Sequence, residues 1–260
     1  MGPLITVSNP FGSEEMAAGY ATSRPPVHAR VIERAARTLN RVAWARRTLD
    51  VGCGSGVSTA ALREHAAACI AIDPAESMLR WGRITAPWAA FAAGAAEAIP
   101  LCNASVECIT AAGSLNYADL DRFFPEARRV LVPEGVLLVY DFGPGMTFRS
   151  EPGLEDWFRR FSARYPPPPN EGRDLDPDIL RQSNSGFRVV REETFEIAIR
   201  LTPRFYLDYM LTETNVASAV RAGVPLPEIR GWCVETLAPV WRGEDKEVMF
   251  RGYWVCLVPH

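Results

Sequence analysis

The stretch from residue 49 to residue 56 limits most strongly what this chain can fold into. It reads LDVGCGSG and joins a short strand pattern, Thr48 to Val51, to a helix pattern, Ser58 to His65. Glycines allow a tight turn and let a ligand approach the backbone closely. A helix that starts above such a turn leaves backbone N–H donors free. The stretch therefore predicts a strand–turn–helix unit that binds a nucleotide-like ligand.

Strand and helix patterns alternate on both sides of this turn. Apolar residues recur at helical spacing between Val27 and Leu39, and Pro74 suits the first turn of another helix. Further strands are predicted at 68–72, 89–92, 106–112 and 136–142, and a further helix at 119–131, with Pro125 starting a second piece and a turn at 133–135. Strands that alternate with helices imply an α/β fold whose parallel sheet is covered on both faces.

The pattern changes after about Gly143. The proline run from Tyr165 to Pro169 predicts an extended loop within an insertion. Around it we predict helices at 177–184 and 205–220 and strands at 187–201 and 249–258, which could complete the sheet edge in antiparallel pairing. We expect one domain over residues 1–260, divided into an N-terminal lid with helices (1–45), a ligand-binding core (46–145), substrate-cap insertions with the sixth strand (146–235) and the final strand (236–260).

The spacing of the glycines separates the kinds of nucleotide that the turn could bind. A dinucleotide site expects G-x-G-x-x-G, whose third glycine position is here Val57, and a phosphate loop expects a Lys that is missing. Asp50 places a carboxylate just before the turn, which would oppose a pyrophosphate and favour an ammonium group. Asp73 ends the next strand, where a carboxylate can accept hydrogen bonds from two ribose hydroxyls. Because Pro74 follows it, Asp73 could instead cap a helix.

Composition further limits the class of protein to which this chain can belong. The chain has 28 Lys and Arg against 31 Asp and Glu, a formal charge of −3, which excludes a generally basic protein that coats nucleic acid. No apolar run approaches the roughly 18 residues that span a bilayer. Met1 to Pro10 shows no secretory signal pattern, so a cytoplasmic location is expected. The six cysteines form no Cys-x-x-Cys pair, so we expect buried thiols and no metal site.

Four segments follow one another in the order and at the spacing of a known family. They are residues 49–56 (LDVGCGSG), 71–79 (AIDPAESML), 94–100 (GAAEAIP) and 126–135 (EARRVLVPEG). With them the chain resembles the class I S-adenosylmethionine-dependent methyltransferases, above all the type 11 branch, whose members mostly modify small molecules. The resemblance implies a Rossmann-like, doubly wound, mostly parallel seven-stranded sheet with an antiparallel edge strand and a helical and loop insertion that forms a substrate cap.

The resemblance also implies which residues hold S-adenosylmethionine and its product S-adenosylhomocysteine. Asp50 would lie near the methionine ammonium, directly or through water, and Asp73 would hold the ribose hydroxyls. The turn would pass beside the methionine and ribose, Met78 would pack on adenine, and Tyr20 would cover the cofactor as part of a lid. The predicted cofactor contacts are Tyr20, Asp50, Gly52, Cys53, Gly54, Asp73, Pro74, Met78, Ala96 and Glu97.

No general base is evident for the methyl acceptor. His28, near the lid, and Tyr117, after the fourth strand, are the candidates, while Asn116 stands where many relatives carry a His and cannot act as a base. The predicted substrate contacts are Asn116, Tyr117, Phe142, Arg149 and Tyr206. Aromatic residues of the insertion could line an apolar pocket or form the core between the insertion and the sheet.

These observations lead us to expect methyl transfer to a small-molecule acceptor by direct displacement at the sulfonium methyl. We expect no nucleic acid and no membrane as partner, and the oligomeric state is open. Two alternatives remain. One is a non-catalytic S-adenosylmethionine-binding or regulatory protein with the same fold, and the other is a dehydrogenase-like dinucleotide enzyme, which NADH binding would reveal.

Overall fold

A computed structural model describes residues 14–39, 45–168, 172–173, 175–182 and 185–260. The expectations for Met1 to Pro10, for Pro169 and for the helix end at 183–184 lie outside the described residues. Residues 165–168 form neither helix nor strand, as the proline run predicts.

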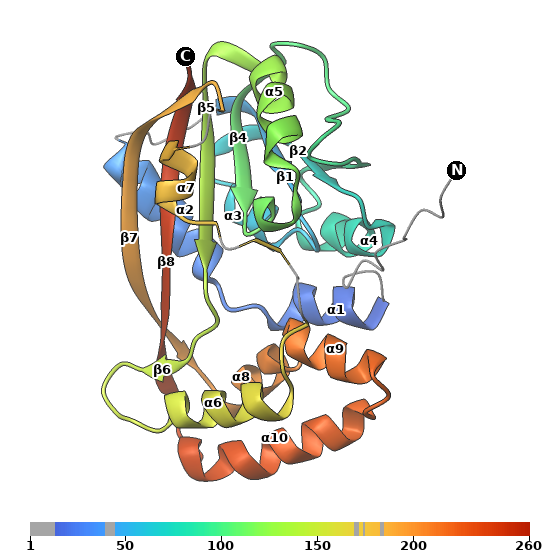
Figure 1. Ribbon diagram of the computed structural model, residues 1–260, viewed down its shortest axis with the longest axis vertical. Helices are drawn as coiled ribbons and strands as arrows, with labels where there is room; N and C mark the ends of the chain where they lie inside the picture. The colour runs from blue at the N-terminus through green and yellow to red at the C-terminus, as the bar shows by residue number, and fades with distance from the viewer. Residues whose placement is uncertain (1–13, 40–44, 169–171, 174, 183–184) are drawn as a thin grey trace.

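One mixed sheet organises the chain (Figure 1). Its strands in the described residues are β1 (Ala45–Val51), β2 (Ala66–Asp73), β3 (Ala90–Ala93), β4 (Val106–Ala112), β5 (Leu131–Phe142), β6 (Thr147–Phe148), β7 (Phe187–Leu201) and β8 (Lys246–Pro259). They lie in the order β3-β2-β1-β4-β5-β8-β6, with β7 also paired to β8. The first five strands pair in parallel, and β8 is antiparallel to β5, β6 and β7. The predicted mostly parallel α/β sheet with antiparallel pairing at one end is confirmed.

The described sheet has eight strands rather than seven, because the two residues of β6 add a short pair to β8. One other detail also differs from the sequence prediction. The turn at 133–135 is a bulge inside β5, since Val106 pairs with Leu131 but Cys108 already pairs with Val136. Each of the other predicted strands overlaps a strand of the structure and extends beyond it by no more than one residue.

The central strands are apolar and are buried on both faces. Leu49 on β1 lies in register between Ile70 on β2 and Ile109 on β4, and Leu49 and Ile109 are wholly buried. The strand order reverses at β1, which has β2 on one side and β4 on the other. Connections leave in opposite directions at such a point, so a crevice opens beyond the carboxyl ends of the strands.

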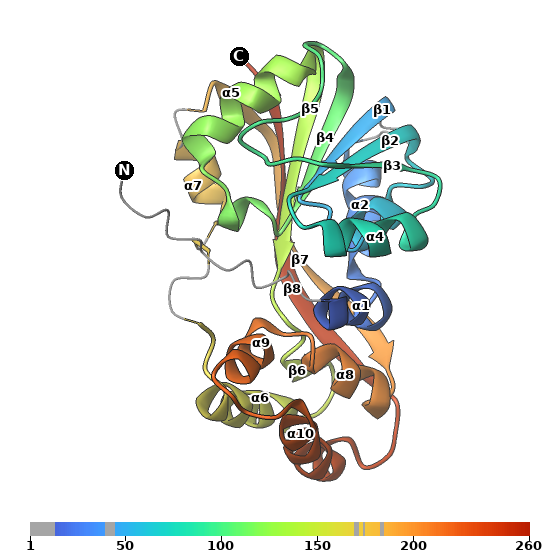
Figure 2. The same ribbon diagram turned by 90° about the vertical axis from the view of Figure 1, so that its right-hand side faces the viewer.

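Helices cover both faces of the sheet, as the alternating pattern predicts (Figure 2). The helices in the described residues are α1 (Glu14–Ser23), α2 (Val27–Thr38), α3 (Val57–Ala61), α4 (Glu76–Thr85), the short 3-10 helix η1 (Leu115–Tyr117), α5 (Leu120–Val130), α6 (Leu154–Arg164), α7 (Pro177–Gln182), α8 (Pro203–Met210), α9 (Thr214–Arg221) and α10 (Leu226–Trp241). Phe123 of α5 packs in one cluster with Leu137 of β5, and Val31 of α2 packs in another with Leu138. Successive residues of β5 therefore serve opposite faces, as strand geometry requires.

Two predicted helices have different limits. Pro125 lies inside α5 instead of starting a second helix. The carbonyl that its missing N–H leaves without a partner belongs to Asp121, in the exposed first turn, where water can satisfy it. The helix predicted at 205–220 is divided into α8 and α9, because the Thr212 hydroxyl and N–H both donate to the Tyr209 carbonyl and end α8.

Four helices, α6, α8, α9 and α10, form a cap beyond the carboxyl end of β5 (Figure 1). Trp157 of α6 stacks on Phe161 with ring centroids 5.3 Å apart, and its Nε1 donates to the Thr236 hydroxyl of α10 at 2.8 Å. The expected boundary between residues 235 and 236 falls inside α10, so cap and final strand are not separated there. Helix α1 contacts α4 of the core and α8 of the cap, and thus connects the two.

The remaining expectations from composition concern cysteines, metals and membranes. All six cysteines are free, and all are buried except Cys102. Among the described residues, no group of three His, Cys, Asp or Glu side chains gathers as a metal site requires. No helix in the described ranges has both the length and the apolar character of a membrane span.

Replacing Trp241 by Ala should destabilise the fold strongly. Its side chain is wholly buried and lies 5.1 Å from the Phe148 ring and 5.3 Å from the Tyr206 ring, between α10 and the rest of the cap. A cavity of this size costs about 3–5 kcal/mol of unfolding free energy, measurable by urea denaturation. Val234→Ala on the same helix, where the side chain is 50% exposed, should change it by less than about 0.5 kcal/mol. Equal effects of the two changes would contradict this packing.

Candidate functional site

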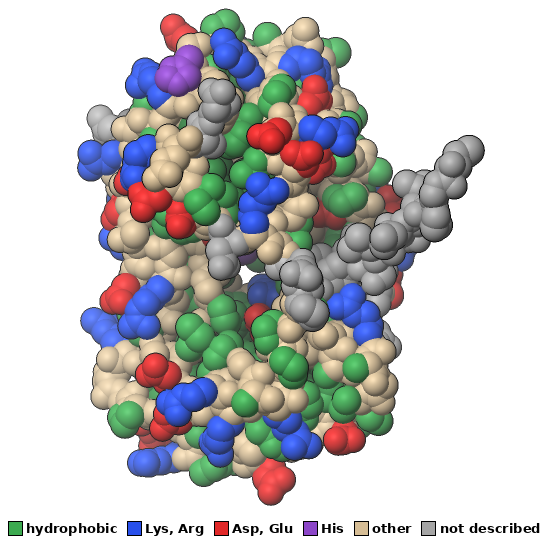
Figure 3. All heavy atoms as spheres, viewed as in Figure 1, with side chains coloured by type: hydrophobic (Ala, Val, Ile, Leu, Met, Phe, Trp, Pro, Cys, Tyr) green, Lys and Arg blue, Asp and Glu red, His purple; other side chains and the backbone are tan. Residues whose placement is uncertain are grey.

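A cavity of about 850 Å³ lies at the carboxyl ends of the parallel strands, between the core, the α1–α2 segment and the cap. The surface is hollowed between these parts (Figure 3). Thirteen of the sequence-predicted residues line it: Tyr20, His28, Gly52, Cys53, Gly54, Asp73, Pro74, Met78, Ala96, Glu97, Asn116, Tyr117 and Phe142. Asp50, Arg149 and Tyr206 do not. The wall also contains charged residues that sequence reasoning missed, namely Arg24, Asp141, Arg173 and Glu213.

The glycine turn forms one side of the cavity, where Gly52 and Gly54 present backbone without side chains. Gly52, Gly54 and Gly56 have φ of +68°, +52° and +83°, a region that favours glycine. The N–H groups of Gly52 and Cys53 donate to the Ile72 carbonyl, which fastens the turn to the end of β2. A Cβ at Gly52 would lie 2.3 Å from the Ser114 Cβ, whereas a Cβ at Gly54 would have no neighbour within 4 Å. Gly54 is thus the point where the bare backbone faces open space in the cavity.

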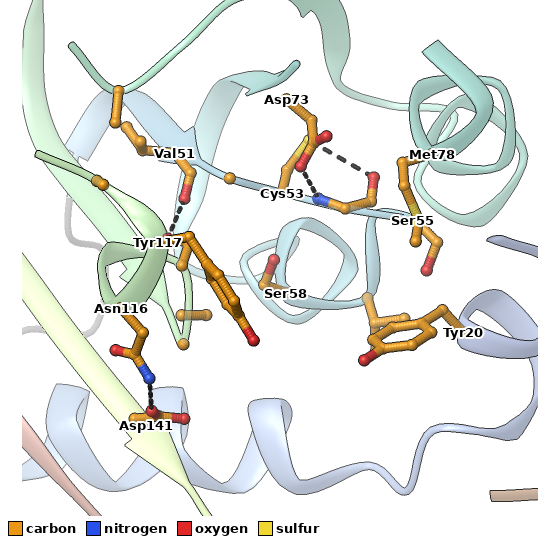
Figure 4. A pocket seen from close by; sticks show the side chains of 18 of the residues that line it. Tyr20, Val51, Cys53, Ser55, Ser58, Asp73, Met78, Asn116, Tyr117 and Asp141 are labelled. Atoms are coloured by element: carbon orange, nitrogen blue, oxygen red, sulfur yellow. Dashed lines mark hydrogen bonds between the residues drawn. The ribbon is translucent and has the colours of Figure 1, made fainter. Parts of the chain in front are cut away.

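Asp73 links this turn to the start of α4. Its Oδ2 accepts the Gly54 N–H at 2.9 Å (Figure 4). Its Oδ1 accepts the Ala75 N–H at 2.8 Å. The carboxylate therefore caps the α4 entry and still lines the cavity, so the two sequence interpretations are compatible. Burial raises the pKa of Asp73, against the opposing effect of the two backbone hydrogen bonds. Each oxygen has a further lone pair with which it can accept a ligand hydroxyl.

Asp50 lies beneath the turn instead of on the cavity wall. It is wholly buried, and it accepts hydrogen bonds from Ser58 and Thr59 at 2.7 Å and from Thr110 at 2.9 Å. Burial raises its pKa, and the three hydroxyl donors oppose that rise. The expectation that Asp50 lies near an ammonium group, directly or through water, stays a prediction; the structure shows that its carboxylate accepts three internal donors and does not line the cavity.

The end of the cavity near α4 is apolar with one acidic edge. Met78 is buried and packs in one cluster with Ala75, Ala17 and Tyr20. Ala96 and Glu97 follow β3 on the opposite wall. The Glu97 carboxylate accepts the N–H of Asp119 at 2.7 Å, which ties this loop to the start of α5. A flat apolar group with a polar edge fits between these walls.

Arg24 fastens the N-terminal segment over the cavity. Its guanidinium lies 3.8 Å from the centre of the Tyr20 ring, pairs with Glu213 at 3.1 Å and donates to the Thr212 carbonyl at 3.2 Å. Tyr20 of α1 is thereby connected with the cap. The sequence signals nothing of this, because Arg24 and Glu213 are 189 positions apart.

Asn116, Tyr117, Asp141 and Phe142 line the opposite end, at the carboxyl ends of β4 and β5 (Figure 4). The Asn116 amide donates to the Asp141 carboxylate at 2.8 Å. Tyr117 is 50% exposed and lies between Asp141 and Asp73 in this view. The only signal of Asp141 in the sequence is its position at the end of an apolar strand.

Two residues predicted to contact substrate lie elsewhere. Arg149 pairs with Glu247 on the surface at 3.2 Å. Tyr206 is wholly buried in the cap and its hydroxyl donates to the Gly145 carbonyl at 2.7 Å. Neither residue lines the cavity, because Arg149 follows β6 on the surface and the Tyr206 side chain of α8 packs inside the cap. The aromatic residues Trp157, Tyr206 and Tyr209 form core between the insertion and the sheet.

His28 is a candidate hydrogen-bond donor and a poor base. Its Nδ1 lies 3.0 Å from the Tyr140 hydroxyl, and its ring packs edge-on against Phe142 with centroids 5.0 Å apart. Burial, and then the charge of Arg24, lowers the His28 pKa to about 3. Burial also raises the Tyr140 pKa well above its usual value, so the phenol keeps its proton. When Tyr140 donates this proton to Nδ1, the imidazole proton resides on Nε2, and His28 can donate but not accept there.

The lowered His28 pKa makes a prediction about stability. The imidazole is neutral in the folded chain but takes up a proton near its ordinary value of 6.5 when unfolded, so its contribution is present above that pH and is lost as pH falls toward about 3. His28→Gln lacks this contribution. The difference in unfolding free energy between wild type and variant should therefore shrink as urea unfolding is measured from about pH 7 down to about pH 5. A difference that stays constant over this range would contradict the neutral, buried imidazole.

Comparison with known proteins gives this geometry a family. A family model described as a methyltransferase domain matches residues 49–139, the stretch from the glycine turn to β5. An uncharacterized methyltransferase of Mycobacterium tuberculosis is 31% identical over 173 residues, so that the chain spans 66% of that relative's length and 66% of its own. A Dictyostelium discoideum protein assigned as a methyltransferase is 30% identical over 203 residues, which are 76% of this chain and 74% of that one.

A solved structure is also similar to this chain in its fold. It is assigned as a type II methyltransferase of Anaeromyxobacter dehalogenans, is 26% identical, and matches 87% of this chain and 97% of its own with a TM-score of 0.63. This match covers more of the chain than residues 49–139, which the family model matches. On the glycine turn, the sheet order and these relatives, the chain belongs to the class I S-adenosylmethionine-dependent methyltransferases.

Proposed function

We propose that this enzyme binds S-adenosylmethionine in the cavity and transfers its methyl group to a small-molecule acceptor. The observation that carries the proposal is the pairing of Gly54 with Asp73. It sets a bare backbone beside a carboxylate that can accept two further hydroxyl hydrogen bonds. A ribose that packs against this turn needs a backbone with no side chain in the way and a carboxylate to accept its hydroxyl hydrogen bonds.

The rest of the wall fits the remaining parts of that donor. Met78, Ala96 and Glu97 offer an apolar slot with one acidic edge to an adenine. Tyr20, held by Arg24, covers the cavity from the side of α1 and helps to exclude water. When bound, S-adenosylmethionine supplies a sulfonium methyl that is already activated for displacement.

The protein's own contribution is alignment and exclusion of water. Holding the acceptor in line with the methyl group can lower the barrier by several kcal/mol, about 7 or more in favourable cases. The cavity volume of about 850 Å³ leaves room for an acceptor beside the donor, at the end formed by Asn116, Tyr117 and Phe142. We favour a small acceptor, because this space is bounded by residues of the cavity wall that include Arg24 and the cap residue Glu213.

Calorimetric titration with S-adenosylmethionine, S-adenosylhomocysteine and NADH tests the cofactor. We expect micromolar binding of the first two and none of NADH. Asp73→Ala should weaken both by about 5- to 150-fold, since stranding hydrogen-bonded groups costs about 1–3 kcal/mol. Asp156→Asn, an exposed acid on α6, is the matched control and should bind as wild type does. Unchanged affinity of a folded Asp73→Ala would remove Asp73 from the site, and binding of NADH alone would overturn the proposal.

Gly54→Val tests the position of the turn. A branched side chain there would project into the cavity, where the described chain offers it no neighbour within 4 Å, and so would occupy the ligand's space. We expect loss of S-adenosylhomocysteine binding by calorimetry, with Gly54→Ala intermediate. Because φ at this position is +52°, circular dichroism must first show that both variants are folded. Normal binding by folded Gly54→Val would show that the ligand lies elsewhere.

Methyl transfer itself separates an active enzyme from the alternative of a silent cofactor-binding protein. A broad screen of small acceptors with S-adenosylmethionine, followed by detection of S-adenosylhomocysteine, should find turnover. Tight cofactor binding with no turnover in that screen would favour the non-catalytic alternative.

A further inference from the structure

Asp141 is a carboxylate on the cavity wall that the cofactor does not require. It is the second-last residue of β5, at the end where Asn116 and Phe142 also line the cavity. In the close view it lies far from Asp73, with Tyr117 between them (Figure 4). The carboxylate that suits a ribose and this one therefore serve different ends of one cavity.

Neutral groups alone hold the Asp141 side chain. Its Oδ2 accepts the Asn116 amide at 2.8 Å, and its Oδ1 accepts the backbone N–H of Phe142 at 2.7 Å. Gly113, at the end of β4, makes room for it, since a Cβ there would come within 2.9 Å of Oδ1. Both oxygens are thus oriented, and each keeps a lone pair for another donor.

No cation neutralises this charge within the part of the chain that the structure describes. Arg24 is paired with Glu213, and His28 is uncharged because its pKa is lowered to about 3. Arg173 is exposed at the cavity rim and meets Asn116 only through its backbone N–H, 2.8 Å from the Asn116 carbonyl. Tyr140 and Tyr253 interact with the charge of Asp141. Both phenols keep their protons, because burial raises their pKa.

Burial accordingly acts on Asp141 without a compensating positive charge. It raises the pKa of this carboxyl, and the Asn116 and Phe142 hydrogen bonds only oppose the rise. A ligand that brings a positive charge or an N–H donor would relieve the same penalty. Two aromatic residues, Phe142 and Tyr117, line the same end of the cavity as this carboxylate. Ring faces and a carboxylate together recognise an ammonium or amine nitrogen.

We propose that Asp141, beside Phe142 and Tyr117, receives the nitrogen of an amine acceptor, so that this enzyme is an N-methyltransferase. The inference rests on the proposed function and names its substrate class. Asn116 is then a positioning residue, because it orients the carboxylate without touching the nitrogen.

In this proposal Asp141 stabilises the positive charge that develops on the acceptor nitrogen during methyl transfer. The reactive form is the neutral amine RNH2, the ammonium form having given its proton to water. As the N–C bond forms, the C–S bond breaks and its electron pair stays on sulfur, so the products are RNH2CH3⁺ and the neutral thioether. Positive charge therefore passes from sulfur to nitrogen, and a fixed carboxylate beside the nitrogen stabilises the transition state more than the starting state. No general base is needed for this step, in keeping with a His28 that cannot accept a proton.

Binding of three matched probes to the S-adenosylhomocysteine complex tests the proposal. Phenethylamine, 2-phenylethanol and 3-phenylpropionate share a ring and a short chain and differ in the charge of the end group. Calorimetry should find the amine bound about tenfold or more tightly than the alcohol, and the carboxylate bound least. Equal binding of the three by wild type, or no binding of the amine, would overturn the proposal.

Asp141→Asn assigns the preference to this residue. The variant should bind S-adenosylhomocysteine as wild type does, which also shows that it is folded, but should lose the preference for the amine over the alcohol. Asp156→Asn should keep it. An Asp141→Asn protein that still prefers the amine would contradict the assignment. If wild type fails to bind S-adenosylhomocysteine, the proposed function fails instead, so the two failures are distinguishable.

Discussion

The buried carboxylate of Asp50 is the interaction on which the arrangement of the site depends. A buried charge is costly unless hydrogen bonds compensate it, and here hydroxyls from α3 and β4 do so. Ser58 and Thr59 hold the first turn of α3 directly behind the glycine turn, while Thr110 holds the neighbouring strand. The glycine turn is thereby fixed between β1 and α3, and Gly54 can meet Asp73 at the end of β2.

From this fixed turn the cavity extends in two directions that differ in chemistry. Toward α4 it offers hydroxyl acceptors and an apolar slot, which suit a nucleoside. Toward β5 it offers aromatic rings and a carboxylate that no cation of the described residues neutralises, which suit an amine. The methyl group would pass where these ends meet, beneath the segment that Arg24 ties to the cap. In that segment the Arg24 guanidinium joins α1 to the cap, because it lies over the Tyr20 and Tyr209 rings and pairs with Glu213.

Much of the core could be predicted from sequence because its signals are local. The apolar runs of β1, β2, β4 and β5, the glycine turn and the acid that ends β2 each lie within a few residues, and the structure has them where they were expected. The cap was harder to predict. Helix α10 contains many apolar residues and Pro239, so its sequence shows no clear periodicity. Helix α6 does carry a periodic apolar face, Leu154, Trp157 and Phe161, which the sequence prediction missed. Pro125 was misread because the carbonyl that it leaves without a partner, that of Asp121, lies in the exposed first turn of α5, so that the proline costs little there.

The sequence by itself determined the α/β alternation, the glycine turn and the carboxylate of Asp73, since backbone conformation and strand–helix order follow from neighbouring residues. Only the tertiary structure decided which distant side chains share the cavity. Asp141 meets Asn116 from 25 positions away and Arg24 meets Glu213 from 189, because parallel strands end at one edge and the cap folds back over it. The same folding buried Tyr206, carried Arg149 to the surface and set Asp50 behind the wall. Whether a polar residue lines a cavity depends on packing between distant segments, which the local sequence does not determine.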